Sequence, residues 1–378
     1  MDNVVLLVFP SAFSANRKDK LITIVKKKLQ LRHIKVNKII LEESCIAFEV
    51  SDVVEAASSI AEMFGIDKVA IAKQVTNRFT NIVKTIVNTG KQIILPREKF
   101  FVKVEVDHNT KLNYVGRDVE FVSSGDLTAN LSSIAAQPAK NEYDADKIIL
   151  SYIGKNSAYV CIQIDKALGG LPFGSQKEKV VCSIHNTLSA LSCLMAIQCG
   201  FTPELLILYT DYNDLKENVK LVGYIYNRMS IKKHKIRIAR IDIPDNSNYC
   251  LKFILQESVS ARILTLLPEK GLVIPLSAAI HPPWFIEATI KKIGFTGKMP
   301  WMPLMLMTDS IYYNAKYVGL EDKIATIETI ISTSVLKKEE YKKHEKKIDI
   351  LSKAAIKNMK TISLNIGPNY LHDIIDSI

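Results

Sequence analysis

The sequence lacks the residue patterns that mark metal-binding and thiol-redox proteins. Six cysteines occur among 378 residues, but no two form a C-x-x-C pair, and the seven histidines form neither H-x-x-x-H nor H-x-x-E-H. We therefore expect no zinc knuckle, no dithiol redox centre and no bound metal. Cysteines scattered in this way, such as Cys45, Cys161 and Cys250, are typical of buried thiols in a reducing compartment.

Long hydrophobic runs are also missing. The best candidate for a membrane-spanning helix, residues 188–208, is interrupted by glutamine, glycine, proline and glutamate, whereas a spanning helix needs roughly 18 uninterrupted apolar residues. The first ten residues contain Asp2 and lack the cationic start and small-residue cleavage site of a signal peptide. We expect a soluble, cytoplasmic protein without a membrane partner.

Acidic residues are too few to balance the basic ones. Fifty Lys and Arg face 39 Asp and Glu, which gives a net charge of +11. Residues 1–38 hold nine basic residues against two acidic ones, so 9 − 2 = +7 of the surplus lies there. Such a local surplus favours a polyanionic partner such as RNA over a merely solvated face. A second basic segment, residues 228–240, has six Lys or Arg and no acid, and fits either interpretation equally.

The length predicts two or three domains, and a composition of 48% hydrophobic and 24% charged residues excludes a disordered or collagenous chain. Hydrophobic periodicity predicts a βαββαβ order in the first 75 residues, the split βαβ order of a ferredoxin-like unit. The expected strands cover residues 4–9, 36–41, 45–50 and 68–73, and the expected helices residues 17–30 and 54–64.

Residues 76–178 are expected to form a mixed α/β module. The predicted helices are 80–87 and 119–134, and the predicted strands are 100–106, 147–153 and 158–164. The module ends in the segment 167–176, in which three glycines and a proline predict backbone that is neither helix nor strand.

From residue 179 to about residue 320, apolar strands alternate with helices, which predicts a doubly wound parallel sheet. The last 58 residues, 321–378, are expected to be helical, finishing with Gly367 and Pro368. They include the charged run 336–350, where charges of opposite sign alternate at helical spacing and predict a solvated helix.

Four segments carry a family resemblance: "GGLPFGSQ" at 169–176, "VVLLVFPSAF" at 4–13, the strand 101–106, and "MPLMLMTDSIYYNAKYVGL" at 302–320. They resemble the tRNA 4-thiouridine synthetase (tRNA sulfurtransferase) family, and the match reaches to about residue 320. The resemblance implies an α/β protein with four parts. These are a ferredoxin-like domain (1–75), an α/β THUMP RNA-binding domain (76–178), a PP-loop-like (adenine nucleotide alpha hydrolase-like) domain (179–320) and a C-terminal helical extension (321–378).

In that family the first two domains bind the acceptor end of tRNA, so the resemblance and the local charge together nominate RNA-binding residues. The set is Arg17, Lys18, Lys20, Lys26, Lys27, Lys103, Lys111, Arg117, Gly169, Gly170, Gly174, Gln176 and Lys177. Glu105 and Asp107 oppose this expectation, because the family tends to be basic where this strand carries them. The glycine segment has a plainer interpretation as a hinge between domains.

The family's PP-loop, S-G-G-x-D-S, is degenerate here. In the ungapped register it falls on residues 184–189, where Ser189 alone matches, His185 and Asn186 replace the glycines, and Leu188 takes the acidic position. A shift by one residue matches Ser183 and puts Thr187 at the acidic position. Neither register restores the small residues or the carboxylate that a phosphate cradle with magnesium needs. The degenerate nucleotide loop thus comprises Ser183, His185, Asn186, Thr187 and Ser189.

Other catalytic parts of the family are missing as well. The T-G-E-x-x-x-Q motif would follow the strand at 272–276, but Pro282 and Pro283 occur there and cannot donate backbone hydrogen bonds. The sulfur-carrying cysteines of the family are missing too, because no C-x-x-C pair occurs. His185 fits a polar loop residue better than a general base, and Cys182 and Cys193 fit core thiols better than remnants of thiol chemistry. We assign no catalytic residue and no cofactor.

The leading hypothesis is a THUMP protein that binds tRNA or another structured RNA and lacks sulfurtransferase activity, with no DNA partner. One alternative is an active, divergent, ATP-dependent tRNA sulfurtransferase or other adenylating tRNA-modifying enzyme, for which ATP would be the cofactor. A second alternative is an RNA-binding accessory subunit of a tRNA-modifying enzyme, which would contact its protein partner through the PP-loop-like domain.

Overall fold

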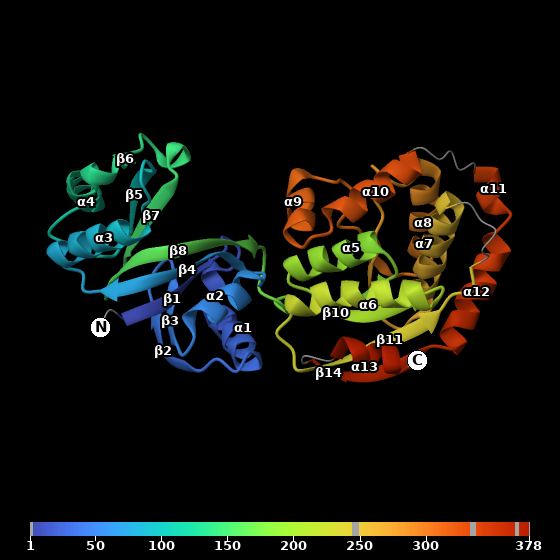
Figure 1. The fold of residues 1–378 in the computed structure, drawn as a ribbon. Coiled ribbons are helices and arrows are strands. Elements are labelled where there is room, and N and C mark those ends of the chain that lie inside the picture. The colour runs from blue at the N-terminus through green and yellow to red at the C-terminus, as the bar shows by residue number, and fades with distance from the viewer. Residues whose placement is uncertain (1–2, 244–248, 333–337, 367–369, 378) are drawn as a thin grey trace. The chain divides into compact units, whose positions relative to one another are not determined.

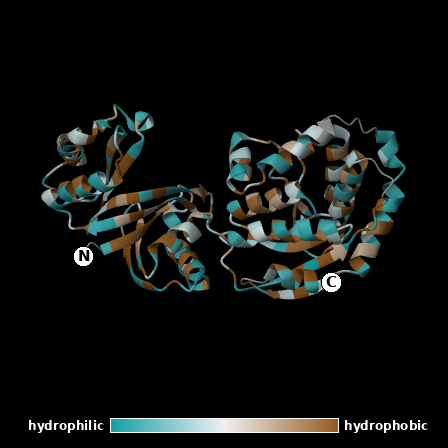
Figure 2. Ribbon diagram, viewed as in Figure 1, coloured by the Kyte–Doolittle hydropathy of each residue, from teal (hydrophilic) through white to brown (hydrophobic). Residues whose placement is uncertain are grey.

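The computed structural model describes residues 3–243, 249–332, 338–366 and 370–377. The chain divides into two compact units, residues 1–170 and 171–378, each built on its own sheet (Figure 1). Hydrophobic residues gather on the strands of both sheets and on the helix faces that cover them (Figure 2). No helix among the described residues is long and apolar enough to cross a membrane.

The first half of unit 1 has the predicted βαββαβ order. Its elements are β1 (Asn3–Pro10), a 3-10 turn η1 (Ala15–Arg17), α1 (Lys18–Leu31), β2 (Val36–Leu41), β3 (Ile46–Val50), α2 (Val53–Ala61) and β4 (Ile66–Val75). The strands lie in the order β2-β3-β1-β4 with all neighbours antiparallel, which is the ferredoxin-like arrangement. Leu21, Val25 and Leu29 of α1 are buried in a core with α2 and the strands.

The second half of unit 1 extends the same sheet. It comprises α3 (Phe79–Ile93), β5 (Lys99–Val106), α4 (Gly116–Leu131), η2 (Ser132–Ile134), β6 (Gln137–Pro138), η3 (Glu142–Asp144), β7 (Lys147–Ile153) and β8 (Ala158–Gly169). The full order is β2-β3-β1-β4-β8-β7-β5-β6, so β2 and β6 are the two edges of one eight-stranded sheet.

Strand β8 corrects one expectation. The strand was predicted to end at residue 164 and residues 167–169 to be irregular, but β8 continues to Gly169. The reason is the long partner strand β4, which places Ile66 opposite Gly169 and supplies backbone partners along the whole length. A strand lengthened by its neighbour leaves no signal in its own residues.

Unit 2 is the expected doubly wound α/β domain. Its elements are β9 (Lys179–Ile184), α5 (Thr187–Gln198), β10 (Thr202–Tyr209), α6 (Tyr212–Asn227), β11 (Lys233–Arg240), α7 (Tyr249–Leu266), β12 (Gly271–Val273), α8 (Pro283–Gly294) and β13 (Met299–Trp301). These strands are parallel in the order β13-β12-β9-β10-β11. The predicted fold class is confirmed in both units.

The C-terminal residues add α9 (Asp309–Tyr317), α10 (Glu321–Ser332), α11 (Lys338–Lys342), α12 (Glu345–Lys357), β14 (Lys360–Asn365) and α13 (Tyr370–Asp376). The expectation that residues 321–378 are all helical is wrong, because β14 pairs antiparallel with β11 and sets Ile362 opposite Ile236. In β14, the apolar residues Ile362 and Leu364 alternate with polar residues, and this pattern suits an edge strand. Gly367 and Pro368 lie outside the described residues.

The charged run 336–350 is helical where it is described, in α11 and α12, and residues 336 and 337 lie outside the described part. It is not simply a solvated helix. Ile348, Ser352 and Ala355 of α12 are buried, and Arg262 of α7 forms an ion pair with Asp349 at 2.7 Å. The charged sequence thus conceals one helix face with buried residues, and this face packs against α7.

A buried carboxylate fastens the two halves of unit 1. Asp107, 3% exposed, accepts hydrogen bonds from the backbone N–H of Glu43 at 2.8 Å and of Ser44 at 3.2 Å. The Ser44 hydroxyl at 3.1 Å and the Tyr152 hydroxyl also donate to it. Burial, followed by the hydrogen bond to Asp107, raises the pKa of Tyr152 well above its ordinary value. The loop between β2 and β3 is thereby held against β5 and β7.

We expect Asp107→Ala to lower the free energy of unfolding by about 3 kcal/mol, because it leaves several buried donors without an acceptor. Asp107→Asn keeps one acceptor oxygen and should cost less. Denaturant unfolding followed by circular dichroism measures both variants. An Ala variant as stable as the wild type would contradict the role assigned to this carboxylate.

Candidate functional site

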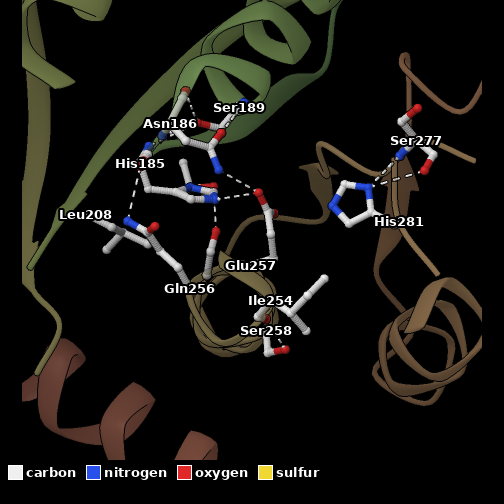
Figure 3. A network of polar contacts seen from close by, with 12 residues as sticks. His185, Asn186, Ser189, Leu208, Ile254, Gln256, Glu257, Ser258, Ser277 and His281 are labelled. Atoms are coloured by element: carbon white, nitrogen blue, oxygen red, sulfur yellow. Dashed lines mark hydrogen bonds and ion pairs between the residues drawn. The ribbon is translucent and has the colours of Figure 1, made fainter. Parts of the chain in front are cut away.

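The turn after the first strand of the parallel sheet is the place where a doubly wound fold binds ligands. Here Asn186 caps α5 by accepting a hydrogen bond from the Ser189 backbone N–H at 2.8 Å. The Ser189 hydroxyl in turn accepts from the backbone N–H of His185 at 2.9 Å and of Asn186 at 3.0 Å (Figure 3). Three N–H groups that could face an anion are therefore bonded within the turn itself.

The side chains of the turn face a carboxylate. Glu257 lies in the middle of α7 and is 3% exposed. Its Oε1 is 3.1 Å from Nε2 of the fully buried His185 side chain and accepts a hydrogen bond from Nδ2 of Asn186 at 2.7 Å (Figure 3). Gln256, its neighbour on α7, donates to the His185 carbonyl at 3.1 Å. Side chains of α7 thus contact both the backbone and the side chains of the turn.

The charge state of Glu257 follows from these contacts. Burial alone would raise the pKa of Glu257, but the charge and hydrogen bond of His185, the charge of His281 and the hydrogen bond from Asn186 together lower it below its ordinary value of 4.5. The carboxylate is therefore ionised at neutral pH.

His281 approaches the same carboxylate from the segment after β12. Its Nδ1 accepts a hydrogen bond from the Ser277 backbone N–H at 3.1 Å, and its ring lies against Phe253 and Phe285 with centroids 5.6 and 5.7 Å away. Burial lowers the pKa of His281, so its ring is neutral at pH 7. Pro282, the next residue, caps α8. This segment starts a helix at the place where the family carries its T-G-E-x-x-x-Q motif.

A cavity of about 440 Å³ opens beside the turn, at the carboxyl ends of β9 and β10. Its acidic lining residues are Asp211, Asp214 and Glu217 of α6 and its N-cap. Asp211 accepts from two N–H groups of the first turn of α6, and Asp214 accepts from the Thr210 backbone N–H at 2.8 Å. Burial raises the pKa of Asp214 above its ordinary value.

The remaining acid, Glu217, forms ion pairs with Lys220 at 2.6 Å and Lys323 at 3.2 Å. The carboxylates of the cavity are thus engaged in hydrogen bonds or ion pairs, and Lys252 and Lys323 also line it. Among the described residues, no group of three or more His, Cys, Asp or Glu is placed to hold a metal ion.

Sequence reasoning missed Glu257, Asp211 and Asp214. The two aspartates had a readable signal, because they follow β10 directly, at the edge of the sheet where ligands bind. Glu257 had only a weak one, a Gln-Glu-Ser group inside an otherwise apolar helix. Among the nominated loop residues, Ser183 and Thr187 are also buried, and the Ser183 hydroxyl accepts from Ser260 of α7 at 2.7 Å.

The cysteines beside the turn are core residues. Cys182 of β9 and Cys193 of α5 are both buried, and burial, followed by the hydrogen bond to Cys193, raises the pKa of the Cys182 thiol well above its ordinary value. A thiol held in its protonated form is a poor nucleophile.

The nominated basic residues of unit 1 fall into two groups. Lys103 forms an ion pair with Glu142 at 2.6 Å, and the Lys18 ammonium donates to the Glu42 and Glu43 carbonyls, so both side chains are engaged inside the unit. Lys20 also has partners. The exposed basic residues of the set in unit 1 are Arg17, Lys20, Lys26, Lys27, Lys111 and Arg117.

The two acidic residues that opposed RNA binding are both neutralised or hidden. Glu105 forms an ion pair with Lys68 at 3.2 Å, and Asp107 is buried in the network described above. Arg117 lines a groove of about 460 Å³ between β5 and α4, beside Phe121, which is 82% exposed. The groove thus places a guanidinium next to an exposed aromatic ring.

The glycine segment joins the two units. Gly169, Gly170 and Gly174 all have positive φ, between 63° and 76°, which glycine adopts without strain. The Gly170 carbonyl accepts from the Ser11 and Ser14 hydroxyls of unit 1, whereas the Gln176 side chain donates to the Cys199 carbonyl of unit 2 at 3.2 Å. Lys177 is exposed.

The His185–Glu257 contact gives stability a defined pH dependence. Because the folded-state pKa of Glu257 lies below its unfolded value, its stabilisation is complete above about pH 4.5 and is lost as pH falls through the folded value. We expect Glu257→Gln to lower the free energy of unfolding by about 2–4 kcal/mol at pH 7 and to flatten the loss of stability below pH 5. Denaturant titrations between pH 3 and 7 test this, with Glu339→Gln on the surface of α11 as control. Parallel pH profiles for wild type and Glu257→Gln would refute it.

Comparison with known proteins connects this geometry to a family. A probable tRNA sulfurtransferase of Methanosarcina mazei is 30% identical over 129 residues, which cover 33% of this chain and 31% of that protein. A tRNA sulfurtransferase of Blochmanniella pennsylvanica is 26% identical over 167 residues, which cover 43% of this chain and 32% of that protein. The matches thus span about a third of the length of these curated relatives. No family model matches the chain.

Two solved structures share the fold. PH1313 from Pyrococcus horikoshii has a TM-score of 0.62 at 18% identity and covers 85% of this chain and 100% of its own. A 4-thiouridine synthetase solved with RNA and bound ATP has a TM-score of 0.64 at 12% identity and covers 96% of this chain and 100% of its own. This chain is similar to tRNA sulfurtransferases in sequence over part of its length, and to a 4-thiouridine synthetase in fold over most of its length.

Proposed function

We propose that this chain is a cytoplasmic tRNA-binding protein that has kept the fold of the tRNA sulfurtransferases and lost their adenylation and sulfur-transfer chemistry. It binds tRNA or another structured RNA through residues 1–75, the ferredoxin-like part, and 76–178, the THUMP part. Residues 179–320 form a degenerate PP-loop-like domain, and residues 321–378 extend it. The domain limits and the RNA-binding residues belong to this proposal.

The observation that carries the loss of chemistry is the closed turn after β9. A phosphate cradle needs free backbone N–H groups and small side chains. Here Ser189 and Asn186 accept the hydrogen bonds of three of these N–H groups, and the ionised Glu257 lies against His185 and Asn186. A phosphate at this turn would have to displace these contacts and approach a buried carboxylate.

RNA binding is supported by three features. One is the name of a structural neighbour, a 4-thiouridine synthetase in complex with RNA. The second is the local charge of +7 in residues 1–38. The third is the groove beside Arg117 and the exposed Phe121. The aromatic ring can stack on an unpaired base while the guanidinium contacts the phosphate of that nucleotide.

We expect magnesium-ATP to leave the thermal unfolding temperature unchanged. A site occupied at 100 times its Kd would add about 2.7 kcal/mol, and thus about 5–10 °C for a unit of this size. Differential scanning fluorimetry with ATP, and with AMP as a control for weak base contacts, measures the effect. A saturable rise with ATP, together with thionucleoside lost from cellular tRNA on deletion of the gene, would favour the active-enzyme alternative.

We expect the affinity for tRNA to fall linearly with salt on logarithmic axes, because binding releases counterions from the phosphates. Arg117→Gln should weaken binding several-fold, whereas Lys103→Gln should change it little, since Glu142 already neutralises Lys103. Filter-binding titrations from 50 to 300 mM salt compare the two variants with wild type. Absence of tRNA binding, or an affinity independent of salt, would refute the proposal.

A further inference from the structure

We propose that the groove between α1 and β2 is the main electrostatic contact of this protein with the phosphate backbone of a structured RNA. The inference rests on the proposed function and deepens it, by naming a surface on the ferredoxin-like half of unit 1. Four lysines line the groove: Lys26 and Lys27 of α1, Lys35 just before β2, and Lys38 of β2.

The shape of this surface suits a chain of anions. The groove has a volume of about 730 Å³ and is open to solvent along the 34–39 segment. Lysines stand on both walls, two from the helix and two from the segment that leads into and along β2. Cations on two facing walls can grip a backbone that runs between them. A flat layer of lipid headgroups would reach only the rims.

The four lysines are available to bind. Each is exposed, and no ion pair to their side chains is formed anywhere in the described ranges of the chain. No acidic residue lines the groove. Glu49 lies opposite Lys38 on the neighbouring strand without forming an ion pair with it, so Lys38 should contribute least. Lys103 on the other half of the unit, by contrast, is neutralised by Glu142.

The position of the groove points to a structured RNA. Strand β2 is one edge of the eight-stranded sheet, and the groove beside Arg117 lies near β5 and β6 at the other edge (Figure 1). Seven strand spacings of about 4.8 Å separate these edges by roughly 34 Å. A ligand that contacts both must be long, such as a double helix of about ten steps at roughly 3.4 Å each. The lysine groove at β2 would then bind the phosphates of the double helix, and the groove beside Arg117 would bind its unpaired end.

The test neutralises the groove and compares it with an equal change elsewhere. The groove variant carries K26Q, K27Q, K35Q and K38Q, and the control carries K342Q, K343Q, K346Q and K347Q on exposed positions of the charged segment 338–350. Both variants lose four positive charges, so any effect of net charge alone is matched. Because all eight side chains are exposed, both should unfold at the wild-type temperature.

We expect the groove variant to bind tRNA more than tenfold more weakly at 0.15 M salt. The slope of log affinity against log salt should fall by about three, because each lost phosphate contact removes about one from it. The control should keep the wild-type slope. Equal slopes for both variants and wild type would overturn the role of the groove in RNA binding and leave the proposed function standing. A wild-type protein that binds no tRNA would overturn both the role of the groove and the proposed function.

Binding to vesicles that contain phosphatidylserine tests whether the groove serves a membrane instead of RNA. The groove variant and the control should bind them equally weakly. Wild-type binding to vesicles that the groove variant loses, with tRNA binding unchanged, would mean that the surface serves a membrane and would overturn the inference.

Discussion

The contact of a buried carboxylate with the first turn of the parallel sheet holds the turn against α7 and shapes this end of unit 2. Glu257 reaches from the middle of α7 to the imidazole of His185 and the amide of Asn186. Removing either partner would leave a charge or a donor stranded in an apolar core, which is costly. The turn is therefore packed against α7 through buried polar contacts. Three backbone N–H groups of the turn are likewise bonded within it.

Unit 1 shows a different use of charge. Some lysines of unit 1 form ion pairs within the protein, as Lys103 does with Glu142. Others are exposed to solvent, as Lys26 and Lys27 of α1 are. A count of basic residues cannot separate the two groups. The same holds for acids, because Asp107 counts against RNA binding in the sequence but is a buried fastener in the structure. Only the partners of each side chain determine the surface that a polyanion would meet.

The sequence predicted most of the fold because the strands of both units are short apolar runs separated by clear turn residues and amphipathic helices. What it could not predict depends on partners far away in the chain. Strand β8 is lengthened by β4, and β14 becomes a strand because β11 offers it an edge. The contact between Asn186 and Glu257 was equally hidden, because Glu257 lies 71 residues beyond Asn186 and no local pattern connects them.

The antiparallel pairing of β14 with β11 also bears on how the protein is made. The residues of unit 1 are complete once position 170 has been synthesised, and domains generally fold as units during synthesis. Unit 2 cannot cover the outer edge of β11 until residues 360–365 have been synthesised. Until then β11 presents a row of unpaired backbone groups, and such an open edge invites pairing with other chains. The pairing of β14 with β11 therefore removes an open edge from the sheet as well as completing it.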